Sequence, residues 1–199
     1  MTTIEEQILE HVRTVPDKVA LISGETEVTS RQMWNYSLRA AATLKSRYNL
    51  KKGERVILSA AGNVEFVYVY FGVHIAGGVC VPIDSDTNQT RFDYIERSTK
   101  PVCVIGSLHN VTHETVQFSE VVAGSEMAEY RTPEIGQVAD ILFTTGTTGA
   151  PKGVALSYAN LSAAANNINT FIQNTKDDVE LLALPVSHSF GLGRLRCSL

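Results

Sequence analysis

The chain has 199 residues, of which 44% are hydrophobic and 19% charged, and its formal net charge is −4. This apolar content can build a sizeable core, so the composition excludes intrinsic disorder. The mildly acidic chain lacks the basic runs of nucleic-acid-binding proteins, so we expect no nucleic-acid partner. Cys80, Cys103 and Cys197 are too few and too scattered for a disulfide framework or a zinc site, and the sequence offers no metal-ligand set. Cys80 and Cys103 lie in apolar runs, which indicates reduced core thiols in a cytoplasmic protein.

The N-terminus is acidic and lacks the apolar segment of a signal peptide. The longest stretch without Asp, Glu, Lys or Arg runs over residues 66–83 and reaches the lower limit of length for a transmembrane helix. His74, the pair Gly77-Gly78 and Pro82 divide this stretch into a buried helix and a short strand. We therefore expect no membrane span, and we expect His74 to belong to the core.

The first fifty residues are predicted to contain two helices with two short strands between them. Two capping boxes, Thr3 with Glu6 and Thr29 with Gln32, mark the starts of the helices. The strands are expected at residues 19–23 and 27–29. The second helix carries a row of apolar side chains on one face: Trp34, Leu38, Ala41 and Leu44.

From residue 51 onwards, short apolar runs alternate with helical patterns. Strands are predicted at residues 55–60, 79–83, 101–105, 139–143, 154–157 and 181–184. Helices are predicted at residues 63–76 and 88–98, and a third carries Leu161, Ala164, Ala165, Ile168 and Ile172 on one face. Residues 107–136 are polar and poorly patterned, which predicts loops with a short strand. Apolar strands alternating with helices predict an α/β fold, with a mostly parallel sheet and helices on both faces.

The most informative stretch joins the strands predicted at residues 139–143 and 154–157. It reads Ile141-Leu-Phe-Thr-Thr-Gly-Thr-Thr-Gly-Ala-Pro-Lys-Gly153. Glycines let the backbone turn with positive φ and approach a ligand closely, and successive N–H groups in such a turn form an anion site. The Thr hydroxyls add donors and Lys152 adds a positive charge. The sequence therefore predicts a phosphate-binding loop. The alternative is a plain hairpin, because Gly- and Thr-rich turns are common.

This loop differs from a Walker A motif, which needs Gly-Lys followed by Ser or Thr. Pro151 precedes Lys152 here, and Gly153 follows it. The chain then continues as an apolar strand, where a Walker loop would open a helix. These differences argue against a P-loop kinase or NTPase.

Residues 143–153, Phe-Thr-Thr-Gly-Thr-Thr-Gly-Ala-Pro-Lys-Gly, resemble the signature loop of the AMP-forming, adenylate-forming enzymes. This family includes acyl- and aryl-CoA synthetases, non-ribosomal peptide adenylation domains and luciferases. One departure is Thr145, where the family more often has Ser. Other stretches resemble the family in the same order: Gly53-Glu-Arg-Val-Ile-Leu, Asn63-Val-Glu-Phe-Val, Gly77-Gly-Val-Cys-Val-Pro-Ile-Asp84 and Leu184-Pro-Val-Ser-His-Ser-Phe-Gly191. The resemblance spans nearly the whole chain and implies the fold of the family's N-terminal subdomain.

The resemblance also implies a two-step reaction with ATP and Mg²⁺. A small-molecule carboxylate attacks the α-phosphate of ATP, pyrophosphate leaves, and a thiol of CoA or of a carrier protein then takes the acyl group from the adenylate. In the family the signature loop holds the β and γ phosphates, and this role carries over to Thr144, Thr145, Gly146, Thr147, Thr148, Gly149 and Lys152.

Two residues after the loop match acyl-site positions of the family. His188 matches a position beside the acyl pocket, near where carboxylate and adenylate meet, and is the candidate catalytic residue. Phe190 matches a neighbouring acyl-site position. Without the resemblance, a single histidine more often caps a helix or packs at the surface.

Several later family segments have no match in this sequence. These are the Thr-Glu motif that grips the adenylate phosphate and metal, the Asp that holds the ribose hydroxyls, and the C-terminal domain with its catalytic Lys. We therefore expect an N-terminal fragment of a ligase that does not complete catalysis alone. The alternative is a non-catalytic phosphate- or nucleotide-binding module.

The resemblance suggests a division of the chain at residue 50. Residues 1–50 would pack partly on a neighbouring subdomain that is missing here, and residues 51–199 would form an α/β subdomain truncated at its C-terminus. The apolar faces of the first segment, with Ile4, Ile8 and Trp34, are then expected to be exposed or paired with a second copy in a homodimer.

Overall fold

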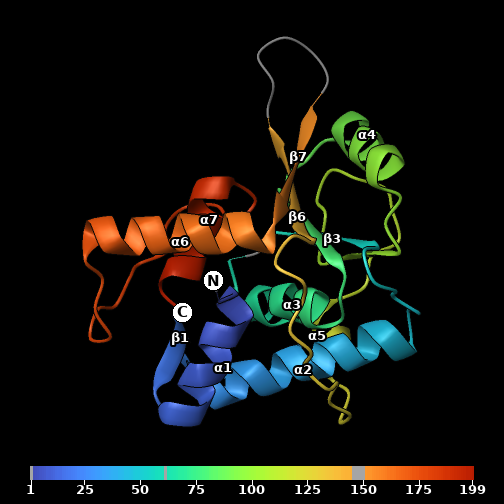
Figure 1. Cartoon of the computed structure of the whole chain (residues 1–199). Helices are drawn as coiled ribbons and strands as arrows, with labels where there is room; N and C mark the ends of the chain where they lie inside the picture. Colours follow the sequence, from blue (N-terminus) through green and yellow to red (C-terminus); the bar gives the residue numbers. More distant parts are fainter. Residues whose placement is uncertain (1, 61, 145–150) are drawn as a thin grey trace.

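The computed structural model describes residues 2–60, 62–144 and 151–199 (Figure 1). The helices in this part of the chain are α1 (Ile4–Thr14), α2 (Ser30–Ser46), α3 (Val64–Ile75), α4 (Gln89–Thr99), α5 (Phe118–Val122), α6 (Tyr158–Ile172) and α7 (Ser189–Cys197). The strands are β1 (Val19–Ser23), β2 (Thr26–Thr29), β3 (Arg55–Ser59), β4 (Val79–Ile83), β5 (Cys103–Ile105), β6 (Val138–Thr144) and β7 (Lys152–Ser157).

Within the described residues, the central sheet has the strand order β5-β3-β4-β6-β7. β5, β3, β4 and β6 run parallel to one another, and β7 returns antiparallel to β6. β1 and β2 form a separate antiparallel pair. The predicted mostly parallel α/β sheet is confirmed.

Helices cover both faces of this sheet, which is why its strands are apolar throughout. Successive side chains of a strand point to opposite faces. On β3, Val56 and Leu58 join the cluster that contains α2 and α3, whereas Ile57 joins the cluster that contains Phe92 of α4. The prediction of helices on both faces is therefore confirmed.

α3 lies between α2 and the sheet and is buried on all sides. Every residue from Phe66 to Ile75 is buried, as expected for a helix that is apolar all round. Gly72 lets α2 approach closely, because a Cβ at this position would lie 2.6 Å from the Cβ of Ala40. The two helices can pack at this distance only if residue 72 has no side chain.

The expectation that the first fifty residues expose their apolar faces is wrong. Ile4, Ile8 and Trp34 are 3%, 1% and 4% exposed. The ring of Tyr130 packs edge-on against Trp34, with the ring centroids 5.3 Å apart, and the amide of Ala128 bonds to the carbonyl of Leu38. Part of the poorly patterned stretch 107–136 thus covers this apolar face. Because the face is covered within the chain, it gives no reason to expect pairing with a second copy.

Three other details differ from the sequence-based expectations. Residues 107–136 contain helix α5 and an isolated bridge of Val116 to Ile105, in place of a short strand. Residues 181–184 form no strand in the part of the chain described; no neighbouring strand there pairs with them, and Leu181 is 89% exposed. α7 was not predicted, since Gly191 and Gly193 hide its helical pattern.

No helix among residues 2–60, 62–144 and 151–199 has the length and apolarity needed to cross a membrane.

The close approach of α2 and α3 can be tested with Gly72→Ala. The added methyl group would overpack the contact with Ala40, so we expect the free energy of unfolding to fall by about 1–3 kcal/mol. The measurement is urea unfolding at equilibrium. Gly193→Ala is the matched control, because it lies in α7 with open space around it, and it should gain up to about 1 kcal/mol of stability. Unchanged stability of Gly72→Ala would contradict the packing.

Candidate active site

The predicted phosphate-binding loop joins two strands that form a hairpin. β6 and β7 pair antiparallel, and Thr144 at the end of β6 lies opposite Lys152 at the start of β7. Both residues are exposed, and this end of the hairpin projects beyond the rest of the sheet (Figure 1, top). Thr145, Gly146, Thr147, Thr148 and Gly149 lie outside the described residues.

The base of the hairpin is fixed by close packing. Phe143 on β6 packs in the cluster with Phe92 of α4. Gly153 faces it on β7, and a Cβ there would lie 3.0 Å from the Phe143 ring. A larger residue at 153 would therefore press on Phe143, so glycine lets the two strands pair where the loop begins.

Arg91 adds a second cation near the loop. It lies on α4, and its Nη2 donates to the carbonyl oxygen of Phe143 at 3.3 Å. A guanidinium next to Thr144 suits a phosphate, because its planar fork of donors matches phosphate oxygens. Sequence reasoning missed Arg91, because nothing in the sequence shows that α4 lies against the end of β6.

Thr144 and Lys152 lie at the carboxyl edge of the parallel strands, where ligands bind in open α/β sheets. A cavity of about 390 Å³ opens at the same edge, beside the ends of β3, β4 and β5. Its polar lining includes Ser59, Asn63, Ser85, Ser107 and His109.

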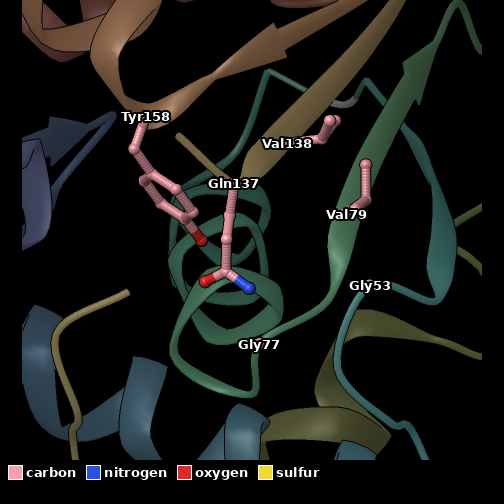
Figure 2. A pocket seen from close by; sticks show the side chains of 6 residues that line it. All are labelled: Gly53, Gly77, Val79, Gln137, Val138 and Tyr158. Carbon is pink, nitrogen blue, oxygen red and sulfur yellow. The ribbon is translucent and has the colours of Figure 1, made fainter. Parts of the chain in front are cut away.

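A second cavity, of about 230 Å³, lies at the opposite edge (Figure 2). It is lined by Gly53, Gly77, Val79, Gln137, Val138 and Tyr158. These residues flank the amino ends of the parallel strands, so this cavity is separate from Thr144 and Lys152.

His188 and Phe190 lie at the start of α7. His188 is the N-cap residue, its side chain makes no capping hydrogen bond, and it is exposed. Phe190 is 66% exposed. Within the described residues, no hydrogen bond joins His188 to the hairpin. The imidazole of His188 lies at the surface without a hydrogen-bond partner among those residues, so it is available to a ligand.

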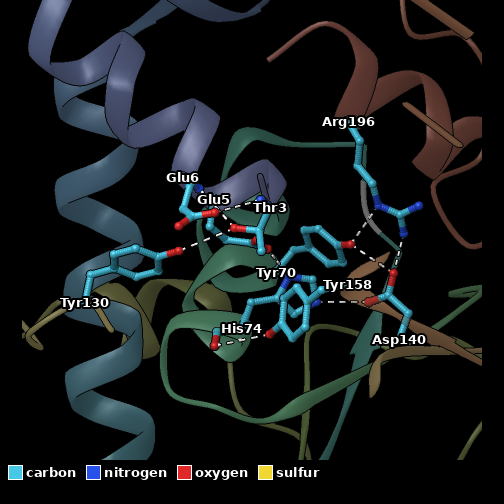
Figure 3. A network of polar contacts seen from close by, with 9 residues as sticks. All are labelled: Thr3, Glu5, Glu6, Tyr70, His74, Tyr130, Asp140, Tyr158 and Arg196. Carbon is cyan, nitrogen blue, oxygen red and sulfur yellow. Dashed lines mark hydrogen bonds and ion pairs between the residues drawn. The ribbon is translucent and has the colours of Figure 1, made fainter. Parts of the chain in front are cut away.

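A buried polar cluster joins β6 to α1, α3 and α7 (Figure 3). His74 of α3 contacts carboxylates at both ring nitrogens, with Nδ1 2.7 Å from Oε1 of Glu5 and Nε2 3.0 Å from Oδ1 of Asp140. Ionised carboxylates only accept hydrogen bonds, so a ring with a proton on each nitrogen satisfies both contacts. Burial disfavours the charged ring, but the hydrogen bonds to Asp140 and Glu5 raise the pKa of His74 to about 9.

Asp140 of β6 is the shared partner in this cluster. Its Oδ2 accepts a hydrogen bond of 2.9 Å from the hydroxyl of Tyr70 and pairs with Nη2 of Arg196 in α7. Burial opposes ionisation, but Arg196 and His74 outweigh it and lower the pKa of Asp140.

The prediction that His74 belongs to the core is confirmed, since it is 3% exposed. Its ionic partners were not predicted. A single Asp inside the apolar run of β6 was the available signal, because a buried carboxylate requires a partner. The cysteines are free, with Cys80 and Cys197 buried and Cys103 partly buried.

Comparisons with known proteins agree with this geometry. The family model described as AMP-binding enzyme matches residues 8–199. The chain belongs to the AMP-binding enzyme family. It is 26% identical over 200 residues to a 2-succinylbenzoate–CoA ligase of Bacillus velezensis, covering 94% of this chain and 40% of that protein. It is 30% identical over 165 residues to gramicidin S synthase 2 of Brevibacillus brevis, covering 80% of this chain and 4% of that protein.

Solved structures of this family share the fold. The O-succinylbenzoate coenzyme A synthetase of Bacillus subtilis, in complex with AMP, matches with a TM-score of 0.87 and 23% identity over 96% of this chain and 52% of that chain. ATP-bound MatB of Rhodopseudomonas palustris matches with a TM-score of 0.87 and 24% identity over all of this chain and 43% of that chain. The chain spans about 40% of the length of the curated CoA ligases it matches.

The charged state of His74 predicts how stability depends on pH. Because the pKa rises from 6.5 to about 9 on folding, the stabilisation is complete below pH 6.5 and is lost as the pH rises through about 9. The loss should amount to about 3 kcal/mol of unfolding free energy, measured by urea unfolding across this range. His74→Gln should flatten this part of the profile.

His109→Gln is the control, because His109 pairs with Asp86 at the surface. It should keep the wild-type slope. A wild-type profile that is already flat between pH 6.5 and about 9 would contradict a charged His74.

Proposed function

We propose that this chain is the N-terminal α/β part of an ATP-dependent, carboxylate-activating ligase, and that its β6–β7 loop binds the β and γ phosphates of ATP. The observation that carries this proposal is the position of the signature loop. The loop follows the carboxyl end of β6. Lys152 lies opposite Thr144 there, and Arg91 donates a hydrogen bond to the carbonyl oxygen of the neighbouring Phe143.

The proposed chemistry requires donors for the leaving group. Attack of a carboxylate on the α-phosphorus forms an acyl adenylate and releases pyrophosphate, on which negative charge builds up. Three donors lie at one end of the hairpin: the cations Lys152 and Arg91, and the neutral hydroxyl of Thr144. Such preorganised donors stabilise the charge that builds up on pyrophosphate. Thr145 to Gly149 complete the loop in the proposal.

Mg²⁺ would be held mainly through the phosphates. No group of three or more His, Cys, Asp or Glu side chains within the described ranges could bind a metal ion. Mg²⁺ commonly binds through one or two carboxylates together with substrate phosphates and waters, so the donors of the hairpin suit a Mg²⁺–ATP complex whose remaining ligands come from elsewhere.

His188 and Phe190 form the proposed acyl side of the site. The exposed imidazole at the N-cap of α7 could orient the carboxylate, and the exposed Phe190 ring could line the acyl pocket. The acceptor in the second step would be the thiol of CoA or of a carrier protein. Three free cysteines fit a reducing cytoplasm.

The proposed phosphate site can be tested with Lys152→Ala. Loss of one charged donor should weaken the binding of Mg²⁺–ATP and of pyrophosphate by about tenfold to a hundredfold, measured by isothermal titration calorimetry. Lys45→Ala is the matched control, because Lys45 is an exposed lysine in the last turn of α2. Equal losses in the two variants, or no binding by the wild-type chain, would contradict the phosphate site.

A second test concerns what the chain can do alone. In the proposal, the groups that hold adenine, ribose and the adenylate phosphate belong to parts of the relatives that this chain does not match. The chain should therefore bind pyrophosphate without catalysing exchange between ATP and pyrophosphate. Exchange at a rate near that of a full-length relative would refute this incompleteness.

A further inference from the structure

The guanidinium of Arg196 joins the last turn of α7 to two elements at once. Its Nε donates to the hydroxyl of Tyr70 on α3 at 2.9 Å, and its Nη2 pairs with Oδ2 of Asp140 on β6. Arg196 is 6% exposed and Asp140 is 0% exposed. A planar guanidinium that uses two donors in this way fixes orientation as well as distance.

The charges of the cluster balance. Glu5 and Asp140 face the positive groups of His74 and Arg196. Removing one partner of a buried pair leaves the other charge uncompensated, which is strongly destabilising. The positions of α1, α3, β6 and α7 are thus tied together by groups that tolerate little displacement.

α7 has further contacts besides this pair, among them the ion pair of Arg194 with Glu180. Leu192, Leu195 and Cys197 bury apolar surface, and the carbonyl of Cys197 accepts a hydrogen bond of 3.1 Å from Nδ2 of Asn169 on α6. Apolar burial is non-directional, so it permits a helix to slide or rotate. Among the hydrogen bonds and ion pairs of the described residues, the pair of Arg196 with Asp140 is the one that joins α7 directly to β6.

The two members of this pair stand close in sequence to the proposed site. Asp140 precedes Thr144 by four residues on β6, and Arg196 follows the N-cap His188 by eight residues. At about 1.5 Å of rise per residue, His188 lies about two helical turns from the pair.

We propose that Arg196 and Asp140 are positioning residues, which hold His188 and the acyl-site end of α7 in a fixed place relative to the phosphate-binding hairpin. This inference rests on the proposed function, which gives His188 and the hairpin their roles. Neither residue would touch the substrate, and both would act through the placement of α7.

The test compares hydrogen exchange in variants of the chain. Arg196→Met removes the charge and keeps the length, and Arg196→Lys keeps the charge but loses the planar fork. In Arg196→Met, exchange of the α7 amides should speed up about tenfold more than exchange of the α3 amides, since local opening of α7 adds to any general loss of stability. Arg196→Lys should restore part of the protection.

His188 supplies a spectroscopic readout in the same variants. Its ring signals should be single in the wild-type chain, and they should shift or broaden in Arg196→Met. Arg97→Met is the control, since Arg97 is an exposed arginine in the last turn of another helix, α4. It should leave the His188 signals and the exchange of α7 unchanged.

Two outcomes would overturn the positioning role. In one, α7 keeps wild-type exchange and His188 keeps its signals in Arg196→Met. In the other, α3 and α7 lose protection by the same factor, which would show only a general loss of stability. If Arg196→Met does not fold, the neutral double variant Asp140→Asn/Arg196→Met and the single Arg196→Lys apply the same criteria. Pyrophosphate binding by the wild-type chain is measured separately, so failure of the proposed function is distinguishable.

Discussion

The buried carboxylate of Asp140 is the constraint on which the rest of this structure depends. An ionised group without contact to water is costly unless it is paired and hydrogen-bonded. Asp140 meets this requirement with Tyr70 and His74 from α3 and with Arg196 from α7. His74 in turn needs Glu5 for its second nitrogen, which attaches the first turn of α1 to the same cluster. One acidic residue on β6 thus accounts for the placement of three helices.

The same strand ends in the loop that gives the chain its proposed function. β6 is buried and anchored at Asp140, and four residues later it reaches the exposed Thr144. A rigid strand that presents an exposed loop is a common way to position binding groups precisely on a surface. The solved relatives share this fold with a TM-score of 0.87, although identity is only 23% and 24%. The arrangement of strands and hairpin is therefore retained in proteins whose side chains differ widely.

The sequence predicts this framework well where short-range patterns suffice. Continuous apolar runs located β3 and β4, and the Gly- and Thr-rich composition located the loop. Other features depend on contacts between distant residues: the pair of Glu5 with His74 and the cover of Trp34 by Tyr130 leave no periodic signal. Residues 181–184 look like a strand because they are apolar, yet pattern alone supplies no pairing partner. Arg91 was missed in the site for the same reason, since only the fold brings α4 to the end of β6.

The central claim is that the exposed end of the β6–β7 hairpin binds the pyrophosphate part of ATP. Its most direct test is a titration of the ¹⁵N-labelled chain with Mg²⁺ and pyrophosphate, followed by amide chemical shifts. The account predicts the largest shifts at Thr144, Lys152 and the residues between them, with a smaller effect at Arg91 and none at Gly53 or Gly77 around the opposite cavity. Saturating pyrophosphate that leaves the hairpin amides unshifted, or that shifts the opposite cavity most, would contradict it.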